Sequence, residues 1–137
     1  MLRKKDLIAG VCRDLNISAP TISYDTSEFP TETTLAMFDP ERDVLHLRRH
    51  YENELDAALA IVHELRHSWQ IKTDEAFWMS GRVSSDDVTS EEYNMQRSEI
   101  DANAYAMVVL RSLGVEPLWN GLSERVKEEI KKRAREI

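Results

Sequence analysis

Cysteine is nearly absent from this sequence, since Cys12 is the only one among 137 residues. A single thiol excludes an intrachain disulfide and a zinc cluster made of cysteines. Such sparse cysteine is typical of proteins in a reducing compartment, and we therefore expect a cytoplasmic protein.

Long apolar runs and excess positive charge are also lacking. No apolar run approaches the roughly 18 residues of a transmembrane helix, so the sequence predicts no membrane span. Lys and Arg number 18 against 25 Asp and Glu, which gives a formal net charge of −7. Because binding along a nucleic-acid backbone requires positive charge, we expect no nucleic-acid partner.

Glycine and proline are infrequent, with four of each, and no repeat or low-complexity tract divides the chain. Hydrophobic residues make up 42% of the sequence, which is enough to bury a core without disulfides. We therefore predict that residues 1–137 form a single domain.

The hydrophobic pattern predicts an α+β fold with a small twisted sheet of three strands, or slightly more. Asn53, Thr89 and Ser123 are candidate N-caps, and Gly114 is a candidate helix terminator. Residues 72–88 show no clear period and should form a long loop. The predicted elements are helices at residues 2–15, about 54–71, 90–113 and 124–137, and strands at residues 21–25, 33–38 and 43–48.

The helix expected after Asn53 contains the pattern His-Glu-x-x-His at residues 63–67. Side chains four positions apart lie on one helix face, so His63 and His67 can bind the same metal ion. Glu64 lies on the flank of that face, where its carboxylate can reach a metal-bound water and act as general base. Two histidines among Ala, Leu, Ile and Val are costly to bury unless a metal satisfies their nitrogens.

A catalytic zinc needs three protein ligands and one open position. The third histidine of the metzincin pattern would fall at position 73 and its glycine at position 70, but these positions hold Thr73 and Gln70. The metzincin class is therefore excluded, and the third ligand must come from another segment.

The helix expected at residues 90–113 supplies that ligand. Positions 99, 102, 103 and 106 form one stripe, in which Ala102 and Ala106 let this helix lie close to the His-Glu-x-x-His helix. We predict Glu99 as the third ligand, and we expect Asn103 to hydrogen-bond the outer nitrogen of a ligand histidine. Asp101 is the rival ligand, but it lies about 200° around the helix from Glu99, so both cannot face the metal.

Residues 63–67 (HELRH) and 99–106 (EIDANAYA) resemble the gluzincin metallopeptidases. They are most similar to the compact minigluzincins and the ImmA/IrrE-type peptidases, whose second motif reads approximately E-x-[E/Q/D]-A-N-x-[F/Y]-A. The resemblance spans residues 55–109. It implies one Zn²⁺ ion, a core of a sheet and helices, ligand roles for His63, His67 and Glu99, and the base role for Glu64.

These features predict a zinc-dependent peptidase whose partner is a peptide or protein substrate. Glu64 would take a proton from a zinc-activated water and later pass it to the leaving amine. The strand at residues 43–48 is the candidate exposed edge for an extended substrate. The residue that stabilises the oxyanion stays open among Tyr93, His46, His50 and Arg97.

Two alternatives to an active peptidase remain. One is a catalytically silent, peptidase-like module that binds a peptide or a protein. The other is a self-inhibited zymogen in which a tail of the chain or the loop at residues 72–88 covers the zinc.

Overall fold

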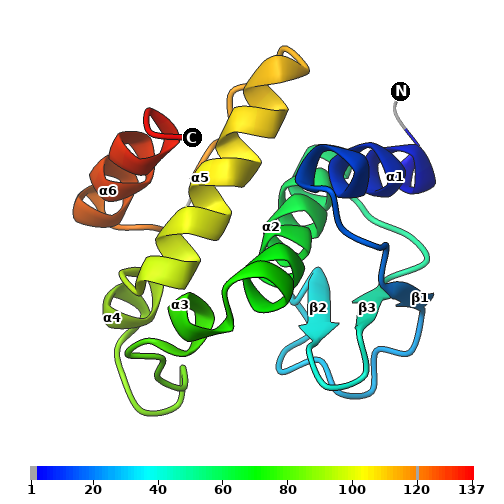
Figure 1. Cartoon of the computed structure of the whole chain (residues 1–137), viewed down its shortest axis with the longest axis horizontal. Coiled ribbons are helices and arrows are strands. Elements are labelled where there is room, and N and C mark those ends of the chain that lie inside the picture. The colour runs from blue at the N-terminus through cyan, green and yellow to red at the C-terminus, as the bar shows by residue number, and fades with distance from the viewer. Residues whose placement is uncertain (1–2, 120) are drawn as a thin grey trace.

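Helices and one small sheet account for the regular structure of residues 3–119 and 121–137, which this computed structural model describes. The described residues form six helices and three strands, which confirms the predicted α+β fold (Figure 1). In chain order these elements are α1 (Lys4–Leu15), β1 (Thr21–Ser23), β2 (Ala36–Asp39), β3 (Val44–Leu47), α2 (Glu54–Thr73), α3 (Glu75–Met79), α4 (Ser90–Asn94), α5 (Arg97–Ser112) and α6 (Glu124–Ala134).

The sheet has the strand order β1-β3-β2. The strand β3 pairs in parallel with β1 and antiparallel with β2, and Leu45 and Leu47 on it are almost completely buried. The prediction that residues 43–48 form an exposed edge is therefore wrong, because both sides of β3 are occupied. The strand at the edge of the sheet that contacts α2 is β2.

The helix α2 is the central element of the fold and lies between α1, the sheet and α5 (Figure 1). It begins at the predicted cap, where the Asn53 side chain accepts hydrogen bonds from the backbone N–H groups of Leu55 and Asp56. Ile61, Val62 and other apolar residues on α2 are completely buried. This burial fixes the rotation of α2 about its axis and hence the direction in which its polar residues point.

The prediction of one continuous helix at residues 90–113 is wrong, because the structure has two helices, α4 and α5, in this range. The capping box at Thr89 is confirmed, but the helix that it starts, α4, ends at Asn94. Gln96 then adopts an extended conformation, and its side chain accepts from the Val83 N–H and donates to the Tyr93 carbonyl. The bond with Val83, which lies in another segment, and the local bond to Tyr93 stabilise the break, and α5 begins after it. Gly114, with φ +83°, follows the end of α5 as predicted.

Smaller differences occur elsewhere. The region expected to be a long loop contains the short helix α3, whose first turn is capped by the Asp74 side chain. The C-terminal helix α6 is capped by Ser123 as predicted but ends at Ala134. The predicted start of the first helix, at residue 2, lies outside the described residues. No helix in the described part of the chain is long and apolar enough to cross a membrane.

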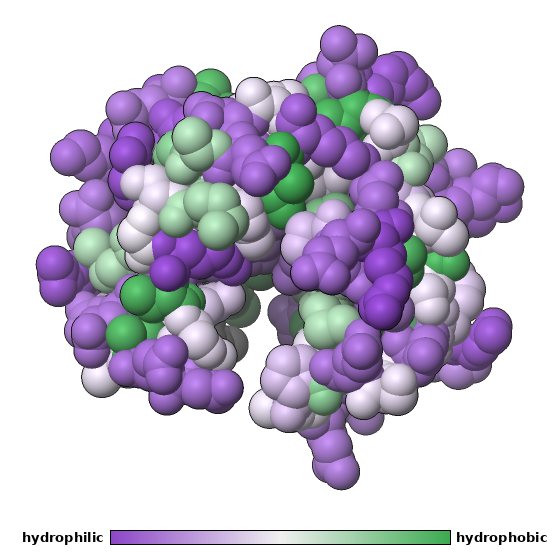
Figure 2. Space-filling model, turned by 60° about the horizontal axis from the view of Figure 1, so that its bottom comes forward, coloured by the Kyte–Doolittle hydropathy of each residue, from purple (hydrophilic) through white to green (hydrophobic). Residues whose placement is uncertain are grey.

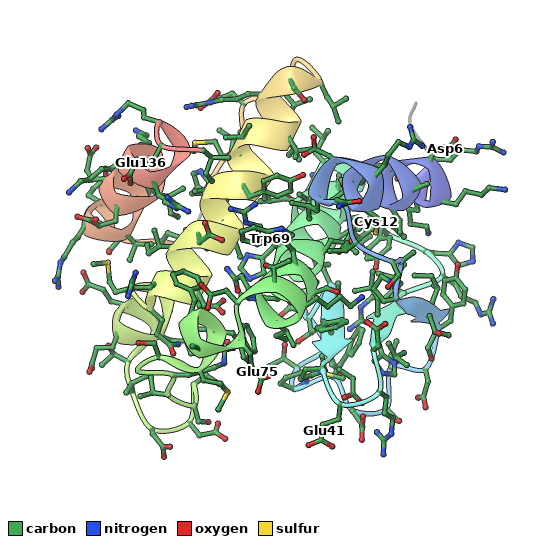
Figure 3. All side chains as sticks on the ribbon, viewed as in Figure 1. Asp6, Cys12, Glu41, Trp69, Glu75 and Glu136 are labelled. Carbon is green, nitrogen blue, oxygen red and sulfur yellow. The ribbon has the colours of Figure 1, made fainter. Side chains whose placement is uncertain are left out.

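Two apolar clusters stabilise this arrangement. The larger joins α1, the sheet, α2 and one side of α5, and it buries Cys12. The smaller joins α5 to α6 and includes Val126 and Ile130, the predicted apolar stripe of the last helix. Figure 3 labels four exposed acidic residues, which lie far apart in the chain: Asp6, Glu41, Glu75 and Glu136.

Candidate metal centre

The helices α2 and α5 lie antiparallel and bring His63, His67 and Glu99 together. Nε2 of His63 lies 3.2 Å from one carboxylate oxygen of Glu99, and Nε2 of His67 lies 2.8 Å from the other. One ligand atom from each of the three residues lies within 4.8 Å of the other two. Ala102 and Ala106, which are completely buried, allow this close approach of α5 to α2.

The outer nitrogens of both histidines are held by side-chain amides. Nδ1 of His63 lies 2.6 Å from the Asn103 amide oxygen, as predicted, and Nδ1 of His67 lies 2.9 Å from the Gln70 amide oxygen. An amide oxygen only accepts, so Nδ1 of each ring is the donor in these contacts, and Nε2, which faces Glu99, is the nitrogen available to bind a metal ion. Two imidazole nitrogens and a carboxylate that converge in this way fit a divalent metal ion such as zinc.

The charges of this group are strongly coupled. Burial alone would lower the pKa of His63, but the hydrogen bond and negative charge of Glu99 raise it to about 9. Burial alone would raise the pKa of Glu99, but the two histidines outweigh it and hold this pKa well below its ordinary value. The carboxylate therefore attracts positive charge to the point between the two imidazoles.

Glu64 lies beside the histidine pair on the side toward the sheet. Burial raises the pKa of its carboxyl above the ordinary value, and His67 and His63 act in the opposite direction. The backbone N–H of Phe38, on the edge strand β2, also interacts with this carboxylate and lowers its pKa. The predicted general base is thus close both to the candidate metal ligands and to the free edge of the sheet.

Asp101, the rival ligand, is directed away from the histidine pair. Its carboxylate accepts two hydrogen bonds from Arg66, at 2.7 and 3.0 Å, and two from Arg133 of α6, at 2.9 and 2.8 Å. It also accepts one from Gln70 at 2.8 Å, and Gln70 in turn holds His67. Asp101 therefore supports the orientation of a histidine, and it also links α2, α5 and α6.

This network was not predicted from the sequence. Gln70 lies three positions after His67, which places it one turn further on the same helix face, and this spacing was the available signal. The contributions of Arg66 and Arg133 depend on how the helices pack, and no local pattern indicates them.

Replacing Asp101 by Ala should lower the free energy of unfolding by about 3–5 kcal/mol, because Arg66 is left buried without its partner. Urea denaturation in the presence of a chelator measures this effect without a contribution from metal binding. The matched control is Glu116→Ala, which removes the exposed ion pair with Arg111 and should leave the free energy of unfolding nearly unchanged. Equal losses for the two variants would contradict a structural role for the Asp101 network.

The segment that contains α3 and α4 covers one side of the histidine pair. The Trp78 ring lies edge-on to His67, with the ring centroids 4.8 Å apart, and Arg82 stacks on Trp78. Arg82 also donates to the Ser98 hydroxyl at 2.9 Å and lies 3.4 Å from a Glu99 oxygen. Part of the predicted loop is thus packed against the candidate centre.

The four candidates for an oxyanion donor lie in different places. Tyr93 is within electrostatic range of the centre: burial and the negative charges of Glu99 and Glu64 raise its pKa. His46 donates from Nδ1 to the Asp25 carbonyl, and His50 is exposed before α2 begins. Arg97 stacks over the Phe77 ring and faces a hollow between α3, α5 and α6.

A hollow of about 360 Å³ opens beside the centre, and His63, Glu64 and Asn103 line it. In the space-filling view, a deep notch separates the part of the surface that carries α3 to α6 from the part that carries the sheet (Figure 2). The hollow is lined from both parts, by Leu35 before β2 and by Leu118 after α5. A ligand in it would contact the candidate base and a candidate metal ligand at once.

Comparisons with known proteins support a metallopeptidase. Searches of curated proteins and of solved structures found no match. A family model matches residues 18–133, a range that includes every residue of the candidate metal centre. The family description implies a metal ion and a peptidase activity. The chain therefore belongs to the putative metallopeptidase family DUF6782.

Proposed function

We propose that this protein is a zinc-dependent peptidase of the gluzincin type, with His63, His67 and Glu99 as the metal ligands and Glu64 as the general base. The observation that carries the proposal is the convergence of two imidazole nitrogens and one carboxylate, with a second carboxylate beside them. Family membership supports the peptidase activity, and the donor set favours zinc among the divalent metals.

A zinc ion at this centre would polarise the substrate carbonyl and make a water molecule more acidic. Glu64 accepts the proton of the attacking water and delivers it to the leaving nitrogen of the cleaved peptide bond. Burial suits Glu64 to the first step, because a raised pKa makes the carboxylate a stronger base. Asn103 and Gln70 keep both histidines in the tautomer that leaves Nε2 free.

The edge strand β2 replaces β3 as the proposed support for an extended substrate. Its neighbour β3 occupies one side, and the Phe38 N–H on the other side interacts with Glu64. A peptide that pairs with this free edge would place its backbone next to the base.

Metal removal tests the proposal. Protein loaded with one equivalent of zinc should cleave members of a mixed peptide library, should lose this activity in 1,10-phenanthroline, and should regain it when zinc is restored. Mass spectrometry of the products identifies the cleaved bonds. Cleavage that persists without metal would contradict the proposal. Binding of peptides without cleavage by the zinc-loaded protein would favour the silent binding module instead.

A further inference from the structure

Two adjoining hollows follow the exposed face of α2 away from the candidate metal centre. The first, of about 360 Å³, contains His63 and Glu64, and the second, of about 110 Å³, lies toward the start of α2. Asp56, Leu59 and Leu118 line both hollows, so the two form one continuous groove. A peptide bound at the centre can extend along this groove.

The part of the groove next to the centre is apolar. Leu35, Leu59 and Ala60 line it beside His63, and Leu118 borders it with 78% of its surface exposed. A large apolar side chain placed in this hollow would cover the exposed Leu118 and remove its own surface from water. The groove therefore favours an apolar substrate residue next to the bond that is cleaved.

Apart from His63, a proposed zinc ligand, the ionisable residues that line the groove are acidic. They are Asp56, Glu64 and Glu116, and no Lys or Arg of the described residues lines either hollow. Glu116 is neutralised by Arg111, which donates two hydrogen bonds of 2.8 Å to it. Within residues 3–119 and 121–137, no Lys, Arg or His side chain forms an ion pair with Asp56, whose carboxylate is exposed to a ligand in both hollows.

The position of Asp56 along α2 sets the distance at which it acts. Asp56 precedes His63 by seven residues and lies on the same helix face, so the two Cα atoms are about 10 Å apart along the helix axis. An extended peptide advances about 3.3 Å per residue. Asp56 therefore lies level with a substrate residue two or three positions beyond the residue next to the cleaved bond.

We propose that the groove selects basic peptides, which place an apolar side chain beside the cleaved bond and a Lys or Arg two or three residues further, against Asp56. This inference rests on the proposed peptidase function. The acidic rim recruits the basic residue by charge complementarity, and the apolar hollow orients the residue next to the bond.

Matched peptides test the inference. Each contains one Leu in a Gly and Ser background, with Lys, Gln or Glu placed two and three residues from it, in one series on the N-terminal side and in another on the C-terminal side. In one of the series, the zinc-loaded protein should cleave the Lys peptide about three- to fivefold faster than the Gln peptide, measured as kcat/KM, because an exposed ion pair has this strength. The preference should decrease at high salt.

Asp56→Asn should abolish the preference for Lys, so that the variant cleaves the Lys and Gln peptides at equal rates. The control is Glu54→Gln, which removes the same charge from an exposed position that lines neither hollow and should keep the preference. Equal cleavage of Lys, Gln and Glu peptides in both series would overturn the inference, as would a preference that survives Asp56→Asn.

Failure of the proposed peptidase function can be distinguished from failure of the proposed preference for basic peptides. If no peptide is cleaved, the proposed function fails, and the binding of the same labelled peptides is then measured by fluorescence anisotropy. Tighter binding of the Lys peptides that depends on Asp56 would still support the basic groove. Equal binding of all peptides, or no binding of any, would overturn it.

Discussion

Glu64→Gln should reduce peptide hydrolysis about 1,000-fold and leave the zinc content unchanged. Gln has nearly the shape of Glu but cannot accept the proton of the attacking water. Glu64 is not one of the three converging ligand donors, so its replacement should not release the metal. Peptide cleavage and zinc stoichiometry, measured on the same preparation, give both values.

The control for this variant is Glu128→Gln, an exposed change on α6 that should alter neither value. If the Glu64 variant kept more than a tenth of the wild-type kcat, Glu64 would not be the base. If the variant instead lost its zinc, the separation of ligand and base roles would be wrong.

Glu99→Ala should weaken zinc binding by more than the roughly 100-fold loss expected for a residue that only orients a ligand. The substitution removes the only carboxylate of the three converging donors and leaves two imidazoles. Competition with a chromogenic chelator measures the Kd for zinc, and circular dichroism checks that the helices remain. Peptide cleavage should be lost together with the metal.

The same assay on Asp101→Ala distinguishes the role of Asp101 from the role of Glu99. The Asp101 carboxylate acts through Gln70, so we expect a loss of zinc affinity of about 10- to 100-fold at most. If Asp101→Ala released zinc and Glu99→Ala kept it, the assignment of the third ligand would be reversed.

The parts of the site that depend on a single helix could be predicted from the sequence. The spacing of His63 and His67 fixes their common face, and the apolar residues around them bury that face. The stripe that contains Glu99 and Asn103 follows from the same period, and the observed contact of Asn103 with His63 agrees with it. Asn53 and Ser123 have cap side chains that bond the first turn locally, so the starts of α2 and α6 were also predictable.

The parts that depend on contacts between distant segments could not be predicted. The break before α5 is stabilised by the bond of Gln96 to Val83, which lies in another segment. The strand β3 is central because β1, which follows α1 in the chain, pairs with the side of β3 that β2 leaves free. The alternation of apolar residues along a strand does not reveal this order. Arg133 reaches Asp101 only because α6 packs against α5, and no local pattern in the sequence indicates this contact.

The most direct test of the proposed centre is a crystal structure of the protein purified without chelator, with anomalous diffraction data collected on both sides of the zinc absorption edge. We predict one strong zinc peak, bonded to Nε2 of His63, to Nε2 of His67 and to the Glu99 carboxylate. A map without a zinc peak between these three side chains, from protein that cleaves peptides, would contradict the account.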